Sequence, residues 1–335
     1  MTTRLTVFRR VALLAALLAF VVVVLGAWVR LSAAGLGCPD WPGCYGHLTV
    51  GQAAQNADSI AQAFPQRPLE YHKAIKEMVH RYFASGLGLL IIALAVLAIR
   101  NRKAPGQPVG LPLALVALVI FQGLLGMWTV TLLLKPLIVV LHLIGGLATL
   151  SLLGWLAIDP DRRSRAREEA GLRRLAGIAL AVLALQIALG GWTSSNYAAL
   201  ACPDFPTCQN AVVPQMDIKD AFVLWRGLGI DYEGGVLDHP ARVAIHFFHR
   251  VGAVVTAVLL GFLSVQVWRK ARSSSLQMAG ALVGAILVVQ LILGPLMVMR
   301  GLPLPLATAH NAVAAALLLS VVRLNRLLRP GEPRF

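Results

Sequence analysis

The stretch Glu77-Met78-Val79-His80-Arg81 begins a long apolar segment with a cluster of ionisable residues. A second stretch of the same kind, His246-Phe247-Phe248-His249-Arg250, begins another apolar segment far downstream. Histidine and arginine are costly inside a bilayer and usually mark function when they are found there. Two copies at equivalent places predict a duplicated binding site.

The composition is that of a membrane protein. Of 335 residues, 58% are hydrophobic and only 13% are charged, and the mean hydropathy is +0.73. Soluble domains carry roughly a quarter charged residues. Apolar runs long enough to cross the hydrocarbon core recur along the chain. They predict eight membrane-spanning helices, over residues 11–29, 78–99, 111–134, 137–158, 175–194, 243–268, 278–299 and 305–322.

The net charge of +15 indicates topology rather than nucleic acid binding, because of where the basic residues lie. They cluster at both termini and after the second, fourth and sixth apolar runs. If all eight runs span the membrane, these segments all lie on the same side of it. The positive-inside rule makes that side cytoplasmic. The first run has the basic start of a signal peptide, but it is long and has an internal counterpart, so we expect a span. Without an Arg- and Ser-rich presequence, a bacterial plasma membrane is favoured.

The chain matches itself at a near-constant offset. At an offset of 164, Gly26-Ala27-Trp28 matches Gly190-Gly191-Trp192, and the Cys-Pro-Asp-aromatic-Pro-x-Cys stretch at 38–44 matches residues 202–208. At 168 or 169, four residues of the first half match four of the second: His80, Gln122, Gly126 and His142 match His249, Gln290, Gly294 and His310.

This repeat predicts an all-α integral membrane protein built from two tandem, pseudo-symmetric four-helix bundles, as in other parallel-repeat membrane proteins. The first bundle is residues 1–158 and the second is residues 175–335, joined by a linker at 159–174. The linker and both termini are expected in the cytoplasm. Long outer loops, at about 30–77 and 195–242, are expected to fold over the outer ends of the helices.

Four histidines are predicted to lie within about the first two turns of their helices, at comparable depth: His80, His142, His249 and His310. The residue one helical turn further on is small each time, which leaves room for a flat macrocycle. Two facing neutral histidines in a four-helix bundle are typical of a bis-histidine heme site. Hydrogen bonding between helices is the simpler alternative, and a di-metal site lacks the required Glu-x-x-His set.

Arg81 and Arg250 follow their histidines at the outer membrane edge. Arginine binds carboxylates through two N–H groups at once, so both are candidates for binding heme propionates. Ordinary extension of the charged head to the interface is the alternative.

The four cysteines lie in the outer loops as two Cys-x5-Cys pairs. Thiols outside the cytoplasm tend to oxidise, so we expect disulfides Cys38–Cys44 and Cys202–Cys208, although four cysteines allow three pairings. Three roles stay open: stapling of the loops, redox chemistry at the first pair, and a four-cysteine zinc site, whose usual spacing is shorter.

The halves differ at Glu77, whose counterpart is His246. A carboxylate at a membrane edge can be a plain surface charge, or it can act as a base or charge stabiliser beside a substrate. Chemistry in the first half and cofactor binding in the second would explain the difference. His246, three residues before His249, is a partner or an alternative ligand of that site.

These residues together resemble the heme A synthases. The resemblance rests on the Gly-Ala-Trp-Val-Arg-Leu segment at 26–31, the Cys-Pro-Asp-Trp-Pro-x-Cys loop, the Glu-x-x-His-Arg motif and all four histidines, and it covers nearly the whole chain. It implies an oxidoreductase acting on a CH group. Such an enzyme oxidises a methyl group of heme O to the formyl group of heme A, in two successive steps, for assembly of terminal cytochrome oxidase.

The resemblance also implies the roles of the residues. His249 and His310 would ligate the iron of a heme b cofactor, and the substrate heme O would bind near His80 and His142. Glu77 would be required for turnover, and the Cys38–Cys44 pair would serve a redox or heme-handling step. Heme O synthase, oxidase assembly factors and further copies of the chain are the protein partners that this role suggests.

A different function shares the histidine pairs. A duplicated bis-histidine electron carrier of the cytochrome b type would handle quinol and modify no heme, but it gives no reason for Glu77 to occur in one half only. A transporter would place its binding sites nearer the midplane, between broken helices, and the sequence shows no such helices.

Overall fold

The structure is a computed structural model that describes residues 3–158 and 170–329. Within these ranges it is all-helical, with eight long helices and three short ones. The long helices are α1 (Thr3–Leu31), α4 (Tyr71–Arg100), α5 (Gly110–Thr131), α6 (Pro136–Ala157), α7 (Ala170–Ser195), α9 (His239–Lys270), α10 (Ser274–Met299) and α11 (Leu304–Leu327). The short helices α2 (Val50–Gln55), α3 (Ala57–Ala63) and α8 (Ile218–Ala221) belong to the outer loops.

Each of the eight long helices is long and apolar enough to cross a membrane, which confirms the predicted spans. Most of the predicted linker, residues 159–169, lies outside the described residues, and the remaining residues 170–174 begin α7. Large apolar side chains along the helices remain exposed, as they must on a surface that faces lipid instead of water. Leu89, Ile120 and Val258 are more than 60% exposed.

Five helices begin four to eight residues earlier than predicted: α1, α4, α7, α9 and α10. Two of these shifts change where predicted histidines lie. α4 begins at Tyr71 and α9 at His239, so His80 and His249 lie in the third turn of their helices and not in the first two. The apolar run missed these turns because they carry polar residues. Asp238 at the N-cap and Pro240 in the first turn start α9, a position where proline's missing N–H costs nothing.

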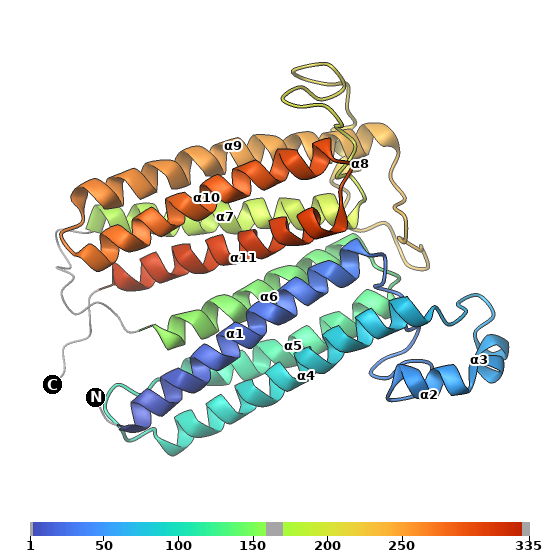
Figure 1. Cartoon of the computed structure of the whole chain (residues 1–335), viewed down its shortest axis with the longest axis horizontal. Helices are drawn as coiled ribbons and strands as arrows, with labels where there is room; N and C mark the ends of the chain where they lie inside the picture. The colour runs from blue at the N-terminus through green and yellow to red at the C-terminus, as the bar shows by residue number, and fades with distance from the viewer. Residues whose placement is uncertain (1–2, 159–169, 330–335) are drawn as a thin grey trace.

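The helices form two groups of four, which Figure 1 shows one above the other. In the first group α1 packs on α4 and α6, and α5 closes the ring between them; in the second, α7 packs on α9 and α11, and α10 closes the ring. The groups meet where α1 and α6 lie against α7 and α11. Gly154 of α6 allows this approach, because a Cβ there would lie 3.0 Å from Leu319 of α11.

Both outer loops lie at the same end of the molecule, at the right of Figure 1, and polar contacts join them. Arg67 of the first loop forms ion pairs with Asp231 at 2.5 Å and Glu233 at 2.9 Å in the second. The side chains are partly exposed, so each pair stabilises the fold by about 1 kcal/mol at most. The second loop thus reaches across to the first half.

Lys135, in the turn between α5 and α6, lies beneath this crossing and is only 2% exposed. Its Nζ donates a hydrogen bond to the carbonyl of Gly227 and lies 3.7 Å from the centre of the Trp225 ring. Burial lowers the pKa of Lys135, because the charged ammonium loses hydration. The carbonyl and the ring replace part of that hydration.

Candidate functional site: paired histidines and the loops above them

His80 of α4 and His142 of α6 face each other inside the first four-helix group. Their ring centres lie 6.5 Å apart, with the ring planes at 83°. Two imidazoles on opposite sides of one metal ion, each with a metal–nitrogen bond of about 2 Å, put their ring centres roughly 6 Å apart. The spacing of the first pair would therefore allow both histidines to ligate one iron ion.

The second pair, His249 of α9 and His310 of α11, occupies the equivalent helices of the other group. The two rings lie near enough to interact electrostatically. The Nε2 atom of Gln290 lies 3.2 Å from Nε2 of His310, a polar contact between α10 and α11. The structure thus brings all four predicted histidines into two pairs, one in each half.

Each histidine ring lies against a glycine of a neighbouring helix, a contact that is not predicted from the sequence. A Cβ at Gly26 would lie 3.0 Å from His80, and one at Gly190 would lie 3.2 Å from His249. The other two pairs, Gly126 with His142 and Gly294 with His310, are both at 3.5 Å. A larger residue at Gly26 or Gly190 would crowd the ring beside it, so these two glycines help to set where His80 and His249 lie, whereas 3.5 Å is an ordinary contact distance.

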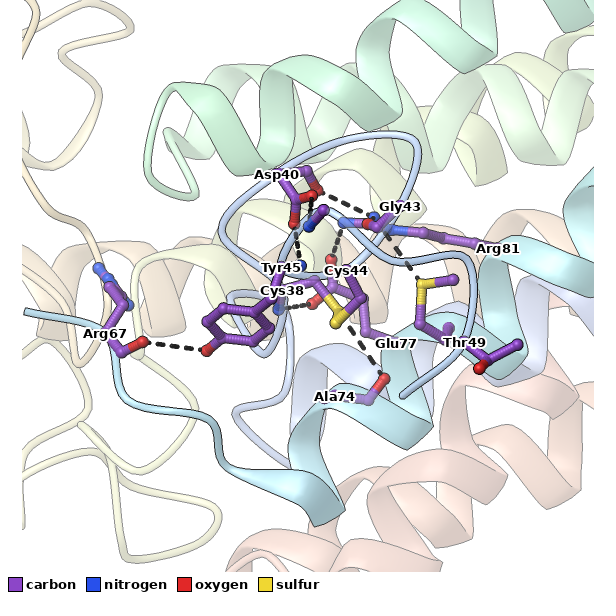
Figure 2. The surroundings of a disulfide bond; sticks show 12 residues. Cys38, Asp40, Gly43, Cys44, Tyr45, Thr49, Arg67, Ala74, Glu77 and Arg81 are labelled. Atoms are coloured by element: carbon purple, nitrogen blue, oxygen red, sulfur yellow. Dashed lines mark hydrogen bonds and ion pairs between the residues drawn. A yellow bond between two sulfur atoms is a disulfide. The ribbon is translucent and has the colours of Figure 1, made fainter. Parts of the chain in front are cut away.

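Glu77 is buried beneath the first outer loop, as Figure 2 shows. One carboxylate oxygen accepts the backbone N–H of Cys38 at 2.9 Å, and the other pairs with Arg81 at 2.5 Å. The carboxylate is therefore held in one orientation, one helical turn from His80, by the loop that contains the disulfide.

His246 occupies the same place in the second half. Its ring nitrogens lie 3.2 Å from the backbone nitrogen of Cys202 and 3.2 Å from Nε of Arg250. Because the loop and Arg250 occupy both nitrogens, His246 is a partner of the loop in this structure and is not positioned as an alternative iron ligand. Glu77 and His246 thus anchor equivalent loops, but only Glu77 brings a carboxylate.

Arg81 and Arg250 both bind backbone carbonyls of the disulfide loops. Arg81 Nη1 donates to the carbonyl oxygens of Asp40 at 3.0 Å and Gly43 at 2.5 Å. Arg250 donates in the same way to three carbonyls of the second loop, those of Cys202, Asp204 and Thr207. The arginines therefore close the loops onto the helices. Propionate binding by these arginines stays a prediction. Only the guanidinium N–H groups that do not bind the loops would be available for it.

The structure forms the two expected disulfides, Cys38–Cys44 and Cys202–Cys208, and all four cysteines are buried. No free cysteine remains in the described part of the chain, which contains all four, so the zinc site is not formed. Asp40 and Asp204 fold their loops alike, each accepting two backbone N–H groups. Hydrogen bonds from the Thr207 side chain and from nearby backbone N–H groups lower the pKa of Asp204 to about 2.

Known proteins are similar to this chain over most of its length. The family described as "Cytochrome oxidase assembly protein" matches residues 9–322. The heme A synthase of Shewanella oneidensis is 44% identical over 310 residues, which cover 92% of each chain. The chain belongs to the heme A synthase family. More distant members include the heme A synthases of Rhizorhabdus wittichii, 28% identical over 92% of this chain and 90% of its own, and Alkalihalophilus pseudofirmus, 27% identical over 75% and 73%.

In this heme A synthase family member, a cavity lies beside the first disulfide loop, away from the histidines. It has a volume of about 630 Å³ and lies between the two outer loops. Its lining includes Gly37, Tyr45 and Arg67 from the first loop and Asp231 and Glu233 from the second. The lining is largely polar and contains none of the four paired histidines.

The arginine contacts give a first prediction. Arg81→Ala should make the Cys38–Cys44 disulfide more easily reduced, because the loop loses the guanidinium that closes it over the buried sulfurs. We expect a reduction rate by dithiothreitol at least ~5-fold higher, since hydrogen bonds from a charged donor are worth about 1.5–3 kcal/mol. Mass spectrometry after thiol alkylation measures the rate for each pair separately.

Arg250→Ala is the matched control, because it should affect only the Cys202–Cys208 pair. Equal reduction rates of the first pair in wild type and Arg81→Ala would contradict the closing role of Arg81.

Proposed function

We propose that this protein is a heme A synthase, an integral membrane enzyme that oxidises the methyl group of heme O to the formyl group of heme A for cytochrome oxidase assembly. The observation that carries the proposal is the asymmetry of the repeat. Two histidine pairs are in register, while a carboxylate, Glu77, stands above only one of them. Membership of the heme A synthase family supports the same reading.

In this proposal His80 and His142 hold the substrate, and His249 and His310 hold a resident heme b. The spacing of the first pair fits a bis-histidine heme, and the second pair repeats its helices and its glycines. Heme b, when bound, supplies one-electron redox chemistry. The protein supplies ligation, orientation and exclusion of water from sites within the bundles.

Glu77 is proposed as the catalytic group. Its carboxylate, fixed by Cys38 N–H and Arg81, would accept a proton or stabilise positive charge at the methyl carbon as that carbon is oxidised. Two successive two-electron oxidations by an external oxidant, each adding one hydroxyl group whose oxygen comes from water or dioxygen, would give the hydroxymethyl group and then the geminal diol, which loses water to form the aldehyde. The fixed orientation supports this role, because a base must be held within hydrogen-bond reach of the atom on which it acts.

We further propose a bacterial plasma membrane location, with the loops, disulfides and both heme sites toward the extracytoplasmic side. The basic segments and the cysteine loops lie at opposite ends of the helices, which supports this orientation. Disulfides also suit an oxidising compartment. Heme O synthase and oxidase assembly factors are the proposed partners, since heme O is too apolar to diffuse freely through water.

Extracting the pigments of the purified membrane protein tests the proposal. A synthase should yield heme O or heme A together with heme b, separated by reversed-phase chromatography. A duplicated electron carrier of the cytochrome b type would instead yield heme b alone, at two equivalents per chain. That second result, in cells that make heme O, would overturn the proposed function.

A further inference from the structure

A basic pocket lies between α7 and α11, at the end of the helices opposite the outer loops, which is the left end in Figure 1. Its volume is about 460 Å³. Arg173 and Gly177 line it from the first turns of α7, and Asn325 and Arg329 line it from the end of α11 and just beyond. Two of these four described residues are arginines and none is acidic.

Contacts between helices hold the walls of this pocket in place. The Nδ2 atom of Asn325 donates to the carbonyl of Ala176 at 3.0 Å, which ties α11 to α7. The guanidinium of Arg329 lies 4.7 Å from the centre of the Trp155 ring, which belongs to α6 of the first half. A guanidinium over an aromatic ring keeps its in-plane N–H groups available to a ligand. The pocket is therefore a built feature of the junction between the halves.

Arg173 and Arg329 have no acidic partner. Neither forms an ion pair within residues 3–158 and 170–329. Arg326 places another guanidinium 4.8 Å from the Trp155 ring. Positive charges gathered around one hollow attract anions, and a guanidinium binds phosphate oxygens through two N–H groups at once. The pocket thus offers both the charge and the donors that a phosphate group requires.

Gly177 keeps the pocket open, because a Cβ there would meet no neighbouring helix within 4 Å among the described residues. At the repeat offset of 164, Gly177 corresponds to Leu13, and at 168 Asn325 corresponds to Ala157. The first half therefore has a bulky side chain in place of the glycine and no amide in place of the asparagine. We expect one such site in each chain.

The pocket lies where the apolar spans end, at the depth of lipid headgroups. Arg173 stands just before the apolar run at 175–194, and Arg329 follows the end of α11. Basic pockets between membrane helices on the cytoplasmic side bind headgroups of anionic lipids. Further along α7, the apolar side chains of Ile178 and Leu185 are 47% and 67% exposed, so acyl chains can lie along this helix. Both features favour a phospholipid over free phosphate.

We propose that this pocket binds the headgroup of one anionic phospholipid. Arg173 and Arg329 bind its phosphate oxygens from α7 and α11, and the space beside Gly177 holds the rest of the headgroup. The lipid lies where α6 of the first half meets α7 and α11 of the second, so it contributes to holding the halves together. This inference does not depend on which heme the histidines bind.

Native mass spectrometry of the purified full-length protein in detergent tests the inference, because it counts the lipids bound to each chain. Wild type should bind one phosphatidylglycerol at least ~10-fold more tightly than phosphatidylcholine with the same acyl chains. A basic residue near an anionic lipid contributes about a factor of 5 in affinity. Joint replacement by Arg173→Gln and Arg329→Gln should therefore weaken phosphatidylglycerol binding by at least ~20-fold.

Gly177→Leu fills the pocket without changing the charge and should weaken binding as strongly, so the test does not depend on the folding of the double variant. Arg174→Gln and Gly171→Leu are the matched controls, because these residues begin α7 but do not line the pocket. Both controls should bind phosphatidylglycerol like wild type. Equal losses in Arg173→Gln and Arg174→Gln would overturn the inference in favour of general charge attraction. Inorganic phosphate that displaces the lipid at equal concentration would overturn it in favour of a soluble anion.

Discussion

Glu77→Gln is expected to reduce heme A formation by at least ~100-fold while heme O remains bound, because a positioned acid or base contributes about 10²–10⁴ to the rate. Glutamine keeps the size of the side chain and can still accept the Cys38 N–H, but it carries no charge and cannot take up a proton. Heme O and heme A extracted from cells that express each variant give the measurement. Unchanged heme A output would contradict the catalytic role.

The repeat offers a sharper variant at the same position. Glu77→His introduces the residue that the second half uses there, and His246 shows that histidine can contact both the loop nitrogen and the arginine. If Glu77 only anchors the disulfide loop, Glu77→His should keep most of the activity. If the carboxylate takes part in the chemistry, Glu77→His should be as inactive as Glu77→Gln. The Cys38–Cys44 disulfide of this variant should still be reduced no faster than in wild type.

Alanine substitutions of the four histidines should have different effects in the two halves of the molecule. His249→Ala and His310→Ala should each lower the heme b content of the purified protein by at least ~10-fold, because one of two axial ligands is lost. His80→Ala and His142→Ala should keep heme b and lose bound heme O and heme A. Absorption spectra and extracted pigments from each variant measure both quantities.

The two sets control for each other, since every variant removes one imidazole from a buried site. Loss of heme b from the first-half variants, with the second-half variants unaffected, would reverse the assignment of the halves. Loss from all four would point to a general folding defect, which gel filtration of the apo-proteins would reveal.

The helices and the histidine pairs could be predicted from the sequence. The helices follow from long apolar runs, and the histidines stand out because they recur in the internal repeat. Runs of about 20 apolar residues are required to cross a bilayer, and all eight are helical in the structure. Their comparable depth within one half predicted that His80 and His142 form a pair, and their rings are neighbours. The cysteine pairs followed from spacing and compartment.

Contacts made by the outer loops could not be predicted in this way. Arg81 looked free to bind a propionate, because nothing in its own segment shows that residues 38–44 fold back onto it. Gln186 is a polar residue within an apolar span, a signal that was present, but only the structure shows His249 beside it. The polar residues at 71–77 hid the first turns of α4 for a similar reason, since hydropathy measures burial in lipid and not helix formation.

The crossing over Lys135 has a consequence for how a duplicated protein of this kind can evolve. Lys135 is the N-cap residue of α6, and the N-cap residue of α11 is Pro303, which has no amine to donate. The contact with Gly227 is therefore made once and in one direction. Two identical copies of an ancestral unit, related by a two-fold axis, would make such a contact twice or not at all. The halves of a single chain are free of that symmetry, so the second outer loop can cover the first half without a reciprocal contact.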